Sequence, residues 1–292
     1  MNPTDLVFPQ TPWIADLVRQ SLAEDIGTGD VSTQVSIPTD ERGVATILAR
    51  SPGVVAGLPL LELLYGELTG DVTVELLVAD GAAVESGDPV ATLSGPVARL
   101  LSGERAALNF LQHLSGIASL VARYVSEVAG TNCLILDTRK TLPGYRELAK
   151  YAVRAGGGFN HRMGLYDRIM FKDNHWAATG GGLATLVAEA RRCFPRLAVE
   201  IEVDSLAQLE QVLPLQVEWI LLDNFDPPCV AQAVAYRDQH DPERRTLLEA
   251  SGNVDLGTVR QYAEAGVDAV SIGRLTHSAP ALDLSLDLER VD

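Results

Sequence analysis

Six short apolar runs in the second half of the chain constrain its fold most strongly, because helical patterns separate most of them. The runs expected to form strands are residues 133–136, 169–171, 198–203, 219–222, 246–250 and 269–272. Helices are expected near 142–154, 183–193, 205–213, 228–239 and 254–265. Such repetition predicts an α/β fold with a parallel sheet, and about six units favour a barrel, complete or incomplete, over an open doubly wound sheet.

Each apolar run is followed directly by polar residues. These clusters are Asp137-Thr138-Arg139-Lys140, Lys172-Asp173-Asn174-His175, Glu200/Glu202/Asp204, Asp223-Asn224, Ser251-Gly252-Asn253 and Gly273-Arg274. In a barrel of parallel strands they would all face one rim, which is where active sites lie in this architecture. The stretch from Cys133 to His175 holds two of the clusters, and we expect the site to be centred there.

The charge distribution indicates what kind of ligand this rim would bind. The chain has a net charge of −16, yet residues 99–172 carry eleven Lys and Arg against five Asp and Glu, which leaves +6 there and −22 elsewhere. All three lysines, Lys140, Lys150 and Lys172, lie in that stretch. A local cationic site in an acidic protein suits a small anion better than nucleic acid, which would require a broad basic face.

The first third of the chain has a different pattern, with an amphipathic helix expected over 12–24, a loop over 25–33 and strands over 44–49, 53–56 and 72–78. Residues 78–95 resemble the small fold that carries biotin or lipoyl groups. They contain no lysine, so we expect a supporting half-barrel without a carrier role. A long helix follows over 102–129, with Arg105 in its first turn. Alternating leucines from Leu282 to Leu288 predict an added strand that returns to the first domain.

Composition limits the remaining classes. No apolar run approaches the roughly 18 residues of a membrane span, and the first ten residues lack a basic region followed by an apolar core. We therefore expect a cytoplasmic protein without a membrane partner. The three cysteines are widely spaced without a metal-ligand pattern, so we expect reduced thiols.

The polar clusters offer complementary chemistry, although each has an ordinary alternative. Arg139 and Lys140 would diverge in an extended chain and hold two anions, or they form a simple turn. His161-Arg162 follows a glycine-rich turn that admits a substrate closely, or it lies in a mobile loop. Arginine binds a carboxylate through two hydrogen bonds, and Lys172 adds a compact charge.

The acidic and glycine-containing clusters complete this inventory. Glu200, Glu202 and Asp204 share one side of their strand and, with Asp223, could hold Mg²⁺ or ribose hydroxyls; alternatively they only protect a strand edge. Ser251-Gly252-Asn253, placed before a predicted helix, forms a phosphate cradle or merely caps that helix.

Several long strings in the chain resemble one enzyme family, the quinolinate phosphoribosyltransferases. These strings are EDIGTGDVST at 24–33, SGERAALNFLQHLSGIA at 102–118, DTRKTLPGYR at 137–146, GGGFNHRMGLYD at 156–167, KDNH at 172–175, EIEVD at 200–204, LLDNF at 221–225, EASGN at 249–253 and SIGRLTHSAPALDLSLDL at 271–288. The resemblance implies an N-terminal α/β sandwich domain over 1–115, joined by the tail 276–292, and an open, incomplete α/β barrel over 116–275. It also implies a pentosyltransferase of NAD biosynthesis that joins quinolinate to phosphoribosyl pyrophosphate and releases pyrophosphate and CO₂ to give nicotinate mononucleotide.

The resemblance further implies roles for individual residues, with Lys140, Lys172, Glu202 and Asp223 as the catalytic set. The two carboxylates of quinolinate would be held by Arg105, Arg139, His161, Arg162 and Lys172, with Thr138 also in the substrate site and Lys140 and Lys172 near the diphosphate. Glu202 and Asp223 would contact the ribose and its Mg²⁺. The 5′-phosphate would bind Ser251, Gly252, Asn253, Ser271 and Gly273. Arg274 departs from the family pattern, and its role stays open.

Two alternatives and one assembly follow from these expectations. A transferase of the same fold acting on nicotinate is the nearest alternative, and the number of cations favours the diacid over it. A carrier or binding module is suggested only by residues 78–95. We expect a homodimer, or an assembly of dimers, in which Arg105 completes the neighbouring subunit's site, because it precedes the barrel in the chain and starts a helix against the dipole.

Overall fold

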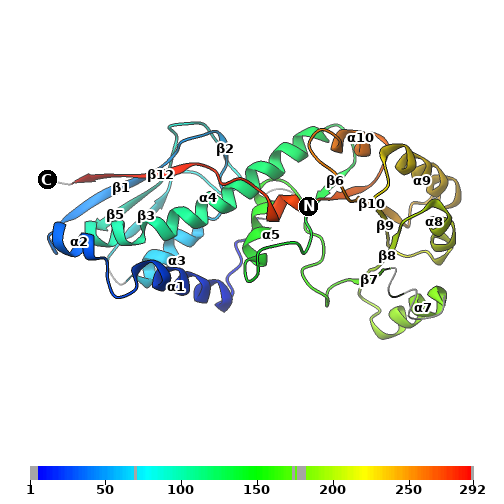
Figure 1. Ribbon diagram of the computed structural model, residues 1–292, viewed down its shortest axis with the longest axis horizontal. Coiled ribbons are helices and arrows are strands. Elements are labelled where there is room, and N and C mark those ends of the chain that lie inside the picture. Colours follow the sequence, from blue (N-terminus) through cyan, green and yellow to red (C-terminus); the bar gives the residue numbers. More distant parts are fainter. Residues whose placement is uncertain (1–5, 69–70, 173–174, 176–181, 291–292) are drawn as a thin grey trace. The chain divides into compact units, whose positions relative to one another are not determined.

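The computed structural model describes residues 6–68, 71–172, 175 and 182–290 and divides the chain into two compact units (Figure 1). Unit 1 comprises Met1–Ala122, Glu147–Gly157 and Ser278–Asp292, and unit 2 comprises Arg123–Arg146 and Gly158–His277. The structure therefore groups residues 147–157 with unit 1, whereas the sequence division at 115 and 275 places them in the barrel region. Asp173 and Asn174 of the predicted KDNH cluster lie outside the described residues.

Unit 1 is built on an antiparallel sheet of order β12-β1-β5-β3. Its strands are β1 (Arg42–Ala49), β3 (Thr73–Leu76), β5 (Pro89–Pro96) and β12 (Leu284–Arg290); a second sheet joins β2 (Gly53–Val54) to β4 (Ala83–Val84). The C-terminal strand β12 pairs along β1, from Ala49 opposite Leu284 to Gly43 opposite Arg290. The predicted return of the tail to the first domain is confirmed.

Helices cover the apolar face of this sheet, which makes unit 1 an α/β sandwich (Figure 1). The helices that belong to unit 1 are α1 (Pro12–Ile26), α2 (Val31–Ser36), α3 (Pro59–Glu67), most of α4 (Val97–Glu127) and all but the first residue of α5 (Arg146–Ala155). Alternate residues of β1, namely Ala45, Ile47 and Ala49, are fully buried. The core forms because the period-two pattern of the strand meets the period-3.6 stripe of the helices.

Two local expectations for unit 1 were wrong. The predicted loop over 25–33 gives way to helix α2 at Val31, because the Asp30 side chain accepts a hydrogen bond from the backbone N–H of Thr33 at 3.0 Å and caps the helix. Helix α4 begins at Val97 instead of near Ser102, so Arg105 lies about two turns inside it. The argument that Arg105 opposes the helix dipole at a helix start therefore fails.

Unit 2 contains a six-stranded parallel sheet of order β6-β11-β10-β9-β8-β7. Its strands are β6 (Leu134–Leu136), β7 (Ile169–Phe171), β8 (Val199–Val203), β9 (Trp219–Asp223), β10 (Leu247–Ser251) and β11 (Ala269–Ser271). The first strand pairs with the last, and among the described residues β6 does not pair with β7. The sheet therefore curls round through the pairing of β6 with β11 but, among the described residues, stays open between β6 and β7. This arrangement confirms the predicted incomplete barrel.

The helices of unit 2 connect successive strands of its sheet, except the last helix, which follows strand β11. They are α7 (Leu183–Cys193), α8 (Leu206–Val212) with the 3₁₀ turn η2 (Leu213–Leu215), α9 (Pro227–His240), α10 (Val259–Glu264) and α11 (Arg274–His277). In β8 the apolar Val199, Ile201 and Val203 alternate with Glu200 and Glu202, so that the polar residues share one side of the strand. None of the helices among the described residues is long and apolar enough to cross a membrane.

Candidate active site

Two adjoining cavities of unit 2 collect the polar residues that follow its strands. The central cavity is lined by Thr138, Arg139, Lys140, His161, Arg162, Met170, Lys172, Glu202, Leu221, Asp223, Glu249, Ser251 and Ser271. The loop cavity is lined by Thr138, Lys140, Ser251, Gly252, Asn253, Val254, Asp255, Ser271, Ile272, Gly273, Arg274 and His277. Every site residue that the family resemblance implies, except Arg105, lines one or both. The side chain of Arg105, in unit 1, is 56% exposed, and its guanidinium lies 4.0 Å from the Glu104 carboxylate.

Apart from Lys172, the cations of the central cavity come from two loops that Arg146 holds together. Its guanidinium donates to the backbone carbonyl oxygen of Met163 at 3.1 Å and to that of Arg139 at 3.3 Å. Arg139 is exposed, whereas Arg162 is buried. Burial, and next the charge of Arg139, lower the pKa of Arg162. Positive charges gathered in this way repel one another, and a bound anion would reduce that repulsion. The arrangement therefore indicates an anion-binding site.

Carboxylates face these cations from the neighbouring strands. Lys172, just after β7, forms an ion pair with Glu202 of β8. Glu202 lies opposite Leu221 in the strand register, and Asp223 follows two residues later on β9. Asp223 Oδ2 accepts a hydrogen bond from the Asn224 side chain at 2.9 Å. The third acid of the predicted set, Asp204, is exposed and lines neither cavity.

A buried polar cluster supports the wall of the central cavity. Asp137 is fully buried and accepts hydrogen bonds from the His161 backbone N–H at 2.9 Å and the Asn160 side chain at 2.6 Å. His161 Nε2 lies 3.2 Å from Glu200 Oε2 and 3.5 Å from Glu249 Oε2. His161 and Arg162 are thus fixed and buried, which is contrary to the mobile-loop alternative.

Two members of this cluster, Arg168 and Glu249, were not singled out from the sequence. Arg168 donates to Glu200 at 3.2 Å, and its guanidinium carbon stands 5.3 Å from the ring centroid of Trp219. Burial disfavours the charge of Glu200, but its contacts with His161 and Arg168 lower its pKa below the ordinary value. Glu249 belongs to the EASGN string, and its position two residues before Ser251 on one strand was the available signal.

The loop cavity is shaped by backbone that only small residues tolerate. Gly252 has φ 98° and Asn253 has φ 55°, and a Cβ atom at Gly252 would stand 2.2 Å from Asn224 Oδ1. A Cβ at Gly273 would stand 2.9 Å from the Lys140 side chain. Helix α10 begins only at Val259, so the predicted helix-start cradle at 251–253 is wrong. Consecutive residues of unusual φ remain suited to aiming backbone N–H groups at an anion.

Arg274 also lines the loop cavity, although its side chain has a protein partner. Burial raises the pKa of Tyr124, and the charge of Arg274, followed by a hydrogen bond with it, opposes that rise. The residue that departs from the family pattern therefore stands at the rim of this cavity beside Lys140 and His277.

Comparisons with known proteins identify the family. Residues 30–115 match the family described as the quinolinate phosphoribosyl transferase N-terminal domain, and residues 117–287 match the corresponding C-terminal domain. The chain belongs to the quinolinate phosphoribosyltransferase family. A nicotinate-nucleotide pyrophosphorylase (carboxylating) of Mycobacterium leprae is 44% identical over 276 residues, which is 94% of this chain and 96% of that protein. A protein of Bacillus subtilis named as a probable enzyme of the same kind is 39% identical, over 93% and 92% of the two chains.

Solved structures agree with the assignment of the fold. NadC from Streptococcus pyogenes is 40% identical, covers 98% of this chain and 100% of its own, and superposes with a TM-score of 0.90. Human nicotinic acid phosphoribosyltransferase is 13% identical with a TM-score of 0.61, over 97% of this chain and 74% of its own, and shares the fold alone.

Proposed function

We propose that this member of the quinolinate phosphoribosyltransferase family converts quinolinate and phosphoribosyl pyrophosphate into nicotinate mononucleotide, pyrophosphate and CO₂ in NAD biosynthesis. One observation carries the proposal beyond family membership. Cations and carboxylates face each other across the central cavity, and Lys140 lines both that cavity and the loop cavity. A substrate with an anionic ring, a ribose and phosphates at two ends would use all of these groups.

The transfer step follows from this arrangement. As pyrophosphate leaves the ribose C1, positive charge develops there, and the carboxylates of Glu202 and Asp223 stabilise it. Lys140 and Lys172 balance the charge of the departing diphosphate. The pyridine nitrogen attacks C1 when Arg139, Arg162 and Lys172 hold the ring carboxylates, because a positioned nucleophile avoids most of the entropic barrier.

Mg²⁺ is proposed as the cofactor, and the donor set fits it. Glu202 and Asp223 offer hard oxygen ligands on adjacent strands, and Mg²⁺ is usually bound through one or two carboxylates plus phosphates and water. Neither belongs to a group of three potential ligands among the described side chains, so the substrate would complete the coordination. When bound, the ion supplies charge neutralisation for the leaving pyrophosphate.

Decarboxylation requires little more of the protein than orientation. Once C1 is bonded to the ring nitrogen, the C2–carboxylate bond breaks and CO₂ leaves. The electron pair stays on C2, where the adjacent positively charged nitrogen stabilises it, and a proton taken up from water at C2 completes nicotinate mononucleotide. The buried Arg162 and the half-buried Lys172 hold the carboxylates in a site with restricted water.

The test of the reaction is the release of labelled CO₂ from carboxyl-labelled quinolinate with phosphoribosyl pyrophosphate and Mg²⁺. We expect release only when all three are present, together with nicotinate mononucleotide. Nicotinate is the control substrate, because it lacks the second carboxylate. Equal turnover of nicotinate and quinolinate would refute the diacid assignment and support the alternative transferase.

We further propose a homodimer, or an assembly of dimers, in which Arg105 acts in the neighbouring subunit. The exposed side chain of Arg105, which lines neither cavity, supports its availability to another chain. The test mixes inactive Arg105→Ala and Lys172→Ala proteins under conditions that exchange subunits. If the site is shared, a mixed two-fold dimer has one intact site, so up to about a quarter of the activity returns. No recovery despite demonstrated exchange would mean that Arg105 acts in its own subunit or only in folding.

The remaining expectations concern partners and compartment. The acidic surface composition supports the absence of a nucleic-acid partner, since polyanions would be repelled. A cytoplasmic location without membrane binding stays a prediction, which fractionation of the source cells would test.

A further inference from the structure

The buried cluster of His161, Glu200 and Glu249 contains two carboxylates and one ring nitrogen between them. Their potential ligand atoms lie within 4.8 Å of one another, and all three residues are buried. Arg168 contacts Glu200 alone among these carboxylates, at 3.2 Å. Neither oxygen of Glu249 has a well-formed hydrogen bond in the part of the chain that the structure describes. Such a group of buried acids must bind either a cation or a proton.

The hydrogen bonds of His161 decide between these two ligands. Its Nδ1 accepts the backbone N–H of Arg162 at 2.7 Å, so in the neutral ring the proton is on Nε2. Nε2 is the atom that faces Glu200 and Glu249. A nitrogen that carries a proton has no lone pair for a metal, and the geometry therefore favours a proton as the ligand of the cluster.

The same geometry indicates which residue holds that proton. Nδ1 of His161 already accepts the backbone N–H of Arg162 and does not face the two carboxylates. Glu200 is satisfied as an anion by Arg168 and His161. Glu249 lacks such partners, and ionising it would leave two buried negative charges beside one ring proton.

Groups from every neighbouring element act on Glu249. Glu200 faces it from β8, His161 and Arg168 from the segments before β7, and Ser271 from β11. Burial and then the charge of Glu200 raise its pKa to about 7, against the opposing effects of His161, Ser271 and Arg168. Electrostatics and hydrogen-bond geometry thus agree.

We propose that Glu249 is a positioning residue of the reaction, which as a neutral carboxylic acid keeps the His161 ring, and through it Arg162, in place at the wall of the central cavity. The inference rests on the proposed function. Arg162 depends on this support, because its backbone N–H is bonded to the His161 ring. Ionised Glu249 would also add a negative charge beneath the wall that receives a dicarboxylate. Deprotonation of Glu249 therefore weakens the binding of quinolinate.

The activity test compares the pH profiles of wild type and Glu249→Gln, since glutamine keeps the shape of the neutral acid. In the wild type, kcat/KM for quinolinate should fall by about tenfold per pH unit above the pKa of Glu249. The fall should arise through KM, with kcat less affected. In Glu249→Gln this alkaline decline should be absent, whatever the variant's absolute activity. Glu249→Ala should have a raised KM already near pH 6, and glutamine should rescue part of that loss.

A second measurement is independent of turnover. Infrared spectra recorded near pH 6 should contain the carbonyl stretch of a protonated, buried carboxyl group, which disappears in Glu249→Gln and persists in Glu200→Gln. An alkaline decline that is unchanged in Glu249→Gln, or a carboxyl band lost only in Glu200→Gln, would overturn the inference. Absence of CO₂ release by the wild type would instead refute the proposed function, and the infrared result would still decide where the proton resides.

Discussion

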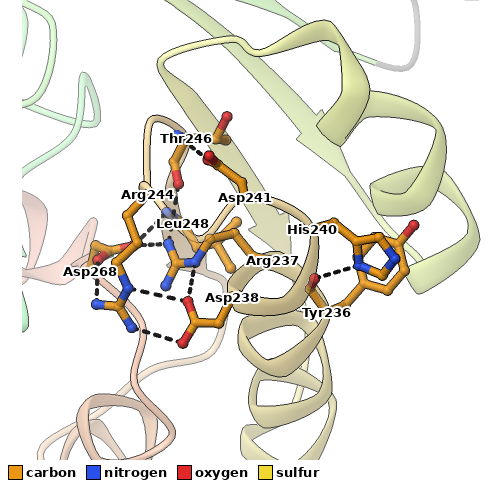
Figure 2. A network of polar contacts seen from close by, with 9 residues as sticks. All are labelled: Tyr236, Arg237, Asp238, His240, Asp241, Arg244, Thr246, Leu248 and Asp268. Carbon is orange, nitrogen blue, oxygen red and sulfur yellow. Dashed lines mark hydrogen bonds and ion pairs between the residues drawn. The ribbon is translucent and has the colours of Figure 1, made fainter.

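The two ends of the barrel sheet both carry buried charge, but they satisfy it differently. At the amino ends of β10 and β11, Arg237 is fully buried and donates to Asp238 at 2.6 Å, to Asp268 at 2.7 Å and to the Thr246 carbonyl oxygen at 3.1 Å (Figure 2). Asp268 also accepts the Leu248 backbone N–H at 2.8 Å, so this network ties the strand starts to helix α9. Only Arg237 Nη2 lacks a partner among the described residues of this network.

At the carboxyl ends of the strands, charges of the same sign lie close together, and some of the charged groups lack full hydrogen bonding among the described residues. Arg139 and Arg162 are close enough for the charge of one to lower the pKa of the other, and Glu249 keeps both oxygens without a well-formed hydrogen bond among the described residues. Like charges held together repel each other and cost stability, whereas the pairing and hydrogen bonds at the opposite end offset the desolvation of the charges there. This difference indicates that the charges at the amino ends of the strands stabilise the fold, whereas those at the carboxyl ends bind an anionic ligand.

The largest effect should come from breaking the amino-end network with Arg237→Met. Removing Arg237 leaves Asp268, among the described residues, with only the more distant Arg244, at 4.0 Å, and costs on the order of 3–5 kcal/mol of unfolding free energy. Denaturant titration measures this loss. The folded variant should keep its KM for quinolinate, since Arg237 lines neither cavity. A loss below about 1 kcal/mol would remove the distinction between the two ends.

At the carboxyl ends of the strands, ionisation of the buried Glu249 should make the free energy of unfolding depend on pH. The folded protein holds the Glu249 proton up to about pH 7, whereas an unfolded glutamic acid releases it near its ordinary pKa of 4.5. This contribution is therefore fully present below pH 4.5 and is lost as pH rises through 7. Wild type should lose at most about 3 kcal/mol relative to Glu249→Gln across this range. Parallel stability curves for the two proteins would contradict this account.

Removing cations from the carboxyl end should affect activity more than stability. For Lys172→Ala and Arg139→Ala, a lost charge-assisted contact to a bound anion costs on the order of 2–3 kcal/mol or more, roughly a 30- to 150-fold fall in kcat/KM. Thermal unfolding should confirm that both variants keep the fold. Near-normal kinetics in either variant would exclude that residue from the site.

Much of the fold could be predicted because it depends on local patterns. The six apolar runs became six strands, and the opening of the barrel followed from family resemblance. The errors lie where a single side chain overrides composition. Asp30 starts a helix inside a stretch rich in glycine and polar residues, and α4 begins at Val97, five residues before the predicted start at 102.

The candidate site divides in the same way. Residues that end strands, such as Lys172 and Asp223, could be found because strand ends meet at one rim. The spacing of Glu249 from Ser251 could have placed it near the site, but its role could not be predicted, since that role depends on which atom of His161 faces it, and this follows from the Arg162 backbone hydrogen bond. Sequence spacing contains no information about a tautomer.

The smallest effect should separate burial from mere pairing within the amino-end network. Arg244, like Arg237, binds Asp238, with Nη2–Oδ2 at 2.9 Å and Nε–Oδ1 at 3.2 Å (Figure 2). Its side chain is 46% exposed, whereas that of Arg237 is 0% exposed. Water can replace an exposed cation, so Arg244→Ala should cost only about 0.2–1 kcal/mol, and added salt should reduce even that. If Arg244→Ala destabilises the protein as much as Arg237→Met, the shared partner Asp238 sets the stability, and burial of Arg237 does not.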